Sequence, residues 1–83
     1  MDEEGFKNWL MNGRRHVTPK VASDYLARCK RVQAIKGNLD TQNLDEILNW
    51  LDNGAPEIHI NGDRQPVIND LKAAIRAYAE FRG

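Results

Sequence analysis

The sequence predicts an all-α fold: a small bundle of four helices of unequal length, forming a single domain over residues 1–83. Apolar residues recur along the chain at the three- and four-residue spacing of one helical face. Residues that cap helix N-termini precede these stretches, and glycines follow most of them. A chain of 83 residues has room for one hydrophobic core. The expected helices cover about 3–12, 18–36, 43–53 and 66–82, with a long loop at 54–65.

The first expected helix carries Phe6, Trp9 and Leu10 on one face and ends at Gly13. A helix of about ten residues is only marginally stable alone in water. We therefore expect it to pack its aromatic side chains against a larger element.

The second expected helix has the clearest boundaries. Thr18 can cap its first amides, Pro19 suits the first helical position, and Gly37 can take the conformation that ends it. At about 100° per residue one side is apolar. That side comprises Val21, Ala22, Tyr25, Leu26, Cys29 and Val32. On the opposite side Lys20, Arg28 and Arg31 cluster, with Lys30 at the margin.

The remaining helices follow from similar signals. Asn43 can cap a third helix that is amphipathic as far as Gly54, and a fourth begins at Pro66. Between them Ile58 and Ile60 are expected to pin the loop to the core. The second and fourth helices are long enough to form the main pair of the bundle. We expect Leu26 and Leu71, one on each of these helices, to be buried in the same core.

Charge is distributed unevenly although the net charge is zero. Residues 14–36 contain seven Lys and Arg against one Asp, whereas residues 37–63 contain six Asp and Glu and no Lys or Arg. One hypothesis is that the basic segment binds DNA weakly and without sequence preference, so that the protein is a non-catalytic DNA-binding accessory module. The candidate nucleic-acid-binding residues are Arg14, Arg15, Lys20, Arg28, Lys30 and Arg31.

Three other interpretations of the basic segment stay open. The face can be an ordinary solvated exterior, or its charges can attract oppositely charged helices within the domain. Alternatively it binds an acidic protein surface, including the 37–63 segment of a second molecule. In that case the protein is an interaction or self-association module.

The sequence lacks the residue patterns of a catalytic or metal site. His16 and His59 lie in expected loops, and Cys29 lies on an apolar helix face. We therefore expect no enzyme activity, cofactor, metal or small-molecule substrate. The acidic start and the absence of a long apolar run argue against export and against a membrane partner, and the single cysteine fits the cytoplasm.

The order of several motifs resembles the helical core-binding domain at the N-terminus of phage-type tyrosine recombinases (integrases), which belong to phages and mobile elements. These motifs are Phe6…Trp9-Leu10, Thr18-Pro19…Ser23-Asp24-Tyr25-Leu26…Arg31, Leu48…Leu51 and Asp70-Leu71-Lys72-Ala73-Ala74-Ile75-Arg76…Tyr78…Phe81. Residues 23–81 are also similar to an uncharacterised helical module at the N-termini of bacterial nuclease-like proteins. Both resemblances imply a small helical fold, and the first implies contact with DNA through basic helix faces. The recombinase catalytic residues have no counterpart in this sequence.

Overall fold

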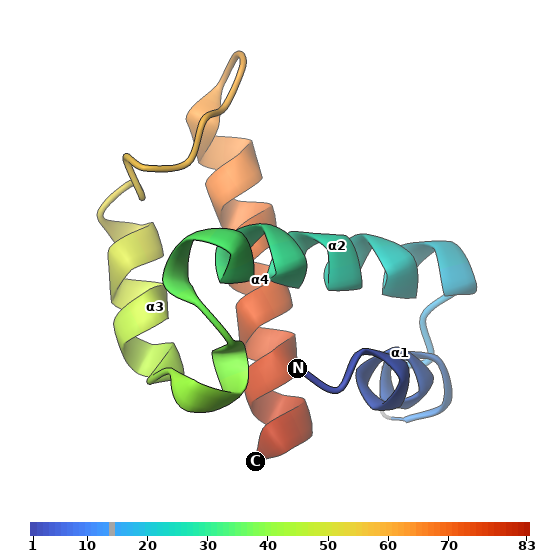
Figure 1. Ribbon diagram of the computed structural model, residues 1–83. Helices are drawn as coiled ribbons and strands as arrows, with labels where there is room; N and C mark the ends of the chain where they lie inside the picture. Colours follow the sequence, from blue (N-terminus) through green and yellow to red (C-terminus); the bar gives the residue numbers. More distant parts are fainter. Residues whose placement is uncertain (14) are drawn as a thin grey trace.

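The computed structural model describes residues 1–13 and 15–83, so Arg14 lies outside the described residues. Within these residues, four α-helices and one 3-10 turn account for the regular structure (Figure 1). They are α1 (Glu3–Asn12), α2 (Pro19–Lys36), the turn η1 (Leu39–Thr41), α3 (Leu44–Asp52) and α4 (Arg64–Arg82). The predicted all-α bundle of four helices is confirmed.

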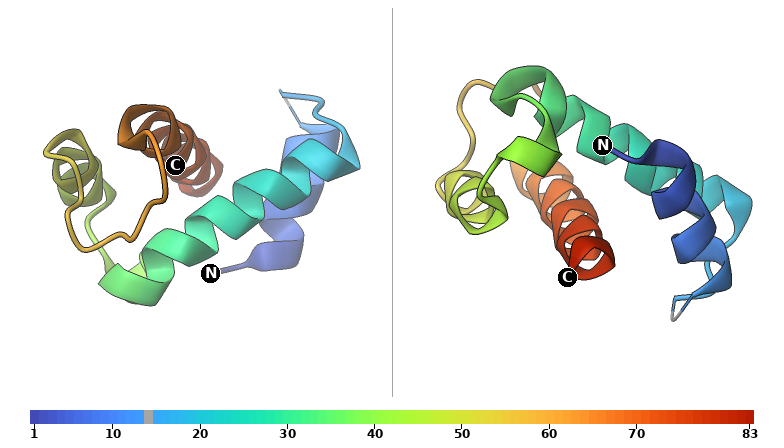
Figure 2. Two further views of the ribbon diagram at one scale, coloured as in Figure 1. Left: turned by 90° about the horizontal axis from the view of Figure 1, so that it is seen from above. Right: turned by 60° about the horizontal axis from the view of Figure 1, so that its bottom comes forward.

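Helix α4 is the central element of the bundle. It packs against α2, α3 and, over a smaller area, α1, while α1 also packs against α2. Figure 1 shows α2 running across the front of α4, with α3 beside α4. Figure 2 shows α1 alongside the N-terminal half of α2. Because α2 lies in front, one side of this helix faces away from the rest of the domain.

Side chains of the residues before α2, α3 and α4 accept hydrogen bonds from the first backbone N–H groups of these helices. The Thr18 hydroxyl accepts a hydrogen bond from the backbone N–H of Val21 at 3.3 Å. The Asn43 side chain accepts hydrogen bonds from the backbone N–H groups of Asp45 and Glu46 at the start of α3. The predicted start of α4 at residue 66 is wrong, because Asp63 caps the helix and α4 begins at Arg64. Pro66 sits in the first turn, where backbone N–H groups have no helical acceptor and a proline is tolerated.

A buried cluster of apolar side chains joins all four helices. Phe6 of α1 meets Tyr78 of α4 edge-on, with ring centroids 5.0 Å apart, and lies 5.6 Å from Phe81. This contact confirms that the short α1 is stabilised by docking its aromatic residues. Leu71 is 1% exposed, as expected for a core position.

Three residues of the apolar side predicted for α2 are less buried than expected. Leu26 and Tyr25 are only half-buried, and Val21 is 38% exposed. The physical reason is that α2 crosses α4 instead of lying along it, so the neighbouring helices cover only part of the apolar side. Ala22, Cys29 and Val32 are the positions of that side that are fully enclosed.

The connection between α3 and α4 has no regular secondary structure, and an arginine of α4 holds three of its carbonyls. The guanidinium of Arg64 donates hydrogen bonds to the carbonyls of Gly54 and Ala55 at 2.8 Å and of Ile58 at 2.9 Å. Ile58 itself is 2% exposed, which confirms that it pins the loop to the core. The predicted loop at 54–65 is therefore two residues too long at its C-terminal end, and its shape depends on a residue of α4.

Candidate interaction surface

The side of α2 that faces away from the domain is the main candidate surface. Its exposed residues include Lys20, Val21, Asp24, Ala27, Arg31 and Ile35, which together are called the outer face of α2 below. Among the described residues, Val21 and Ile35 are the large hydrophobic side chains that are exposed, at 38% and 40%. The outer face of α2 therefore combines two exposed apolar side chains, 14 positions apart, with charged residues between them.

Most of the predicted nucleic-acid-binding residues that the structure describes contact other residues of the domain. Arg14 lies outside the described residues. Lys30 pairs with Glu3 of α1 at 3.4 Å, and Arg31 donates a 2.6 Å hydrogen bond to the carbonyl of His59. Two of the predicted cations therefore already have a partner in α1 or in the loop before α4.

The two described arginines that remain gather around Tyr25. The guanidinium carbons of Arg15 and Arg28 lie 6.0 and 5.9 Å from the centre of the Tyr25 ring, a cation–π geometry. Arg15 also pairs with Glu80 at 3.1 Å, and Arg28 with Asp70 at 3.8 Å. The apolar side predicted for this helix includes Tyr25, and this cluster is not among the features predicted from the sequence, although the three-residue spacing of Tyr25 and Arg28 is a signal for it.

Lys20 differs from the other described candidates. Its side chain is exposed and makes no hydrogen bond or ion pair with residues 1–13 or 15–83. The same holds for Asp24, one turn further along the outer face. These two side chains are free to meet a partner without first breaking a contact inside the domain.

Two carboxylates of the acidic segment 37–63 form ion pairs with cations from other parts of the chain. Asp52 pairs with Lys72 of α4, and Asp40 lies 3.6 Å from the guanidinium of Arg82. In the described part of the chain no ion pair joins the basic segment 14–36 to the acidic segment 37–63. The ion pairs of the described residues therefore run from each segment to α1, to α4 or to the Met1 ammonium, whereas the two segments meet through other contacts, such as that of Lys36, whose ammonium lies 4.4 Å from the centre of the Trp50 ring.

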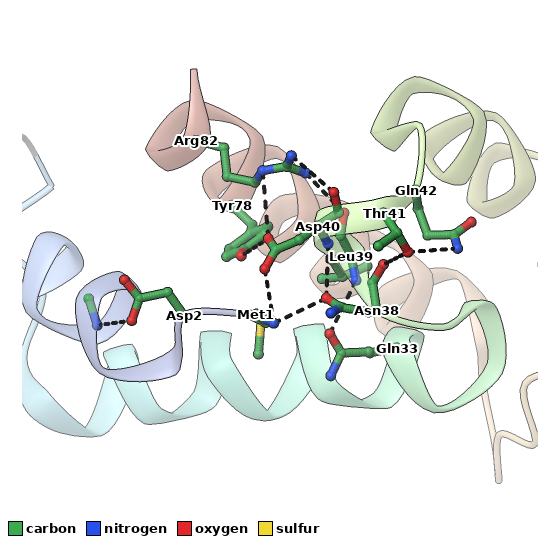
Figure 3. A network of polar contacts seen from close by, with 11 residues as sticks. Met1, Asp2, Gln33, Asn38, Leu39, Asp40, Thr41, Gln42, Tyr78 and Arg82 are labelled. Carbon is green, nitrogen blue, oxygen red and sulfur yellow. Dashed lines mark hydrogen bonds and ion pairs between the residues drawn. The ribbon is translucent and has the colours of Figure 1, made fainter.

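A second polar cluster surrounds Asp40 where η1 meets α4 (Figure 3). The Asp40 carboxylate accepts a 2.5 Å hydrogen bond from the Tyr78 hydroxyl and lies 3.1 Å from the ammonium of Met1. Arg82 adds a 2.9 Å hydrogen bond to the carbonyl of Leu39. These contacts fix η1 to the C-terminal end of α4, which is a structural role.

The same contacts shift two pKa values. The hydrogen bond from Tyr78, and next the hydrogen bond from the Met1 ammonium, lower the pKa of the Asp40 carboxyl below its ordinary value of 3.8. Burial, and next the hydrogen bond to Asp40, raise the pKa of Tyr78 to about 12. The pair is therefore held as a carboxylate and a neutral phenol across the neutral pH range.

The side chains considered for catalysis do not form a reactive group. The Cys29 thiol is buried and donates to the carbonyl of Ala74 at 3.4 Å, and burial raises its pKa to about 12. A protonated thiol without a neighbouring base is a poor nucleophile. Across residues 1–13 and 15–83, His, Cys, Asp and Glu side chains do not gather in a group of three or more that could hold a metal ion.

One hollow opens between the end of α2 and the start of α3. It is lined by Lys36, Gln42, Asn43, Glu46 and Ile47 and has a volume of about 80 Å³. Sites for small molecules usually measure roughly 300–1,000 Å³. This hollow is too small for such a ligand.

Comparison of the chain with known protein families, curated proteins and solved structures gave no match. The resemblance to recombinase core-binding domains therefore has the sequence motifs as its whole support. In the described part of the chain, each helix falls short of the length or apolar character needed to cross a bilayer.

Proposed function

We propose that this domain is a non-catalytic protein-interaction module and that the outer face of α2 is its binding surface. The observation that carries the proposal is the exposure of Val21 and Ile35 on the same helix face as Lys20 and Arg31. Burying the two apolar side chains against a partner gives affinity, while the cations favour an acidic surface and orient it. The unpaired Cys29 fits a reducing compartment, and we expect the module to act in the cytoplasm.

Double-stranded DNA is the second candidate partner. It is favoured by the exposure of Lys20, Lys30 and Arg31 along one helix, and by the resemblance to core-binding domains. Two observations favour a protein instead. Phosphates make no use of exposed valine and isoleucine side chains. A phosphate would also have to displace the carboxylate of Glu3 from Lys30, although an exposed pair of this kind contributes only about 0–1 kcal/mol.

The test compares proteins captured from a lysate of the source cells by three immobilised baits, after nuclease treatment. The baits are the wild-type domain, the double variant Val21→Asp/Ile35→Asp, and the control Asn49→Asp, which adds charge at an exposed site on α3. The proposal expects one or more proteins to be lost with the double variant and kept with the control. If the double variant retains the same proteins as the wild type, the outer face of α2 is not the binding surface.

The DNA alternative is tested directly by fluorescence anisotropy with a labelled duplex at several salt concentrations. Binding through Lys20 and Arg31 alone predicts a slope of about −1.8 for the logarithm of affinity against the logarithm of salt, and four phosphate contacts predict about −3.6. A slope of this size would favour DNA over a protein partner. The Val21→Asp/Ile35→Asp variant should then lose only as much affinity for the duplex as its two added negative charges explain.

A further inference from the structure

Five exposed residues of the outer face of α2 are arranged symmetrically about the middle of the helix, with an acidic residue on one side of the midpoint matched by a basic residue on the other. From the N-terminal end this face presents apolar Val21, acidic Asp24, small Ala27, basic Arg31 and apolar Ile35, and all five residues are exposed. Asp24 and Arg31 stand one turn to either side of the Ala27–Arg28 step. Such an arrangement is complementary to itself when a second copy is turned by 180°.

We infer that a second copy of this chain binds to the outer face of α2, with the two α2 helices antiparallel about a two-fold axis near Ala27. This inference rests on the proposed function, because it names the partner of the same surface. It differs from head-to-tail pairing of the basic segment with the acidic segment 37–63. A two-fold contact closes on itself and gives a dimer, whereas head-to-tail contacts can continue into chains.

Helix geometry brings the complementary residues to the same level. At a rise of about 1.5 Å per residue, Asp24 and Arg31 each lie about 5 Å along the helix from the midpoint between residues 27 and 28. In an antiparallel pair, Asp24 of each copy is therefore level with Arg31 of the other. Val21 and Ile35 lie about 10 and 11 Å from the midpoint, so the apolar side chains of the two copies also meet at each end.

Neighbouring contacts leave this face open. Arg28, beside the axis, forms an ion pair with Asp70 of α4, and Lys30 forms one with Glu3 of α1. Both cations are therefore directed toward neighbouring helices and away from the outer face of α2. The small side chain of Ala27 at the centre lets two helices approach closely. Asp24 has no side-chain partner among the described residues, and Arg31 uses one guanidinium nitrogen on His59, leaving donors for a carboxylate.

A contact through one helix from each copy buries little surface, so we expect the dimer to have a low affinity that depends on the salt concentration. Interfaces well below the usual size bind with low affinity, and the dimer fraction should rise between about 10 µM and about 1 mM protein. Higher salt should lower it, because salt screens the attraction between the exposed charges of Asp24 and Arg31 that brings the two copies together.

The test is sedimentation equilibrium of the 83-residue chain, with circular dichroism of each variant to check folding. Asp24→Arg places arginine opposite arginine twice, and Arg31→Asp places aspartate opposite aspartate twice. Each variant should raise the dissociation constant of its own dimer at least tenfold. An equimolar mixture of the two variants restores both opposite-charge contacts and should dimerise at least as well as the wild type, as should the double variant.

Asp45→Arg is the matched control, because it makes the same charge change at an exposed residue of the acidic segment. The inference predicts no effect of this variant on the dimer. Dissociation caused by Asp45→Arg and not by Asp24→Arg would overturn it in favour of head-to-tail pairing. A wild-type monomer up to about 1 mM, or failure of the mixture to associate, would also overturn it; the capture experiment with the α2 double variant would still decide the proposed function separately.

Discussion

The burial of Leu71 and Leu26 differs, and this difference gives a quantitative prediction for two substitutions of the same kind. Leu71 is 1% exposed, so Leu71→Ala removes a fully buried side chain and leaves a cavity, which costs about 3–5 kcal/mol of unfolding free energy. Leu26 is half-buried at the edge of the core. Leu26→Ala should cost about half as much, roughly 1.5–2.5 kcal/mol, because water already covers part of its surface.

These costs are large for a domain of this size. Total stability at about 0.05–0.15 kcal/mol per residue is roughly 4–12 kcal/mol for this chain. A loss of 1 kcal/mol lowers Tm by about 4–8 °C in a small domain, so Leu71→Ala should lower Tm by at least about 12 °C. Differential scanning calorimetry and urea unfolding monitored by circular dichroism would measure both variants.

Ile35→Ala serves as the control for an exposed aliphatic residue on the same helix as Leu26. Ile35 is 40% exposed, and its replacement should cost less than about 1 kcal/mol. If Leu26→Ala destabilises as much as Leu71→Ala, the assignment of Leu26 to the edge of the core is wrong. If Ile35→Ala destabilises more than Leu26→Ala, the outer face of α2 is misassigned.

Four further predictions concern the polar contacts and one helix end. The lowered pKa of Asp40 means that its contribution to stability is present above its unfolded value of 3.8 and is lost as pH falls through the folded pKa, so Asp40→Asn should flatten the acid limb of a Tm-versus-pH profile. The raised pKa of Tyr78 works in the opposite direction: its contribution is lost as pH rises from 10 to about 12, and Tyr78→Phe should flatten that alkaline limb. Arg64→Lys cannot reproduce the forked hydrogen bonds to the loop at 53–63, and amide hydrogen exchange there should become faster while α1 is unaffected; unchanged exchange would refute the role of Arg64. Gly37 ends α2 at φ 92°, so Gly37→Ala should cost about 1 kcal/mol in urea unfolding, and no loss would show that this end of α2 relaxes freely.

The distribution of charge in this protein is easily misinterpreted from composition alone. The basic segment 14–36 suggested a continuous cationic surface, but Lys30 and Arg28 turn toward carboxylates of α1 and α4. Because both pairs are exposed, they contribute little to stability. Their effect is to remove cations from the outer face of α2 and to leave apolar residues prominent there.

The sequence by itself determined the helices, since helix formation depends on neighbours within about one turn. Thr18, Pro19 and Gly37 mark the ends of α2 through contacts with residues a few positions away, and the spacing of Phe6 and Leu10 marks the buried side of α1. The start of α4 at Arg64 was also present in the sequence, in the capping residue Asp63. The predicted start at Pro66 differs because proline is favoured at the first helical position, whereas here it stands at the third position of the helix.

Only the tertiary structure decided which parts of these helices are covered and which charges are paired. Periodicity gives the direction of Val21 and Leu26 around α2, but the crossing of α2 over α4 decides that the first is exposed and the second half-buried. The contact of Asp40 with Tyr78 joins residues 38 positions apart, and that of Arg15 with Glu80 joins residues 65 apart. No local pattern specifies such pairs, because they form only when packing of the apolar sides brings distant segments together.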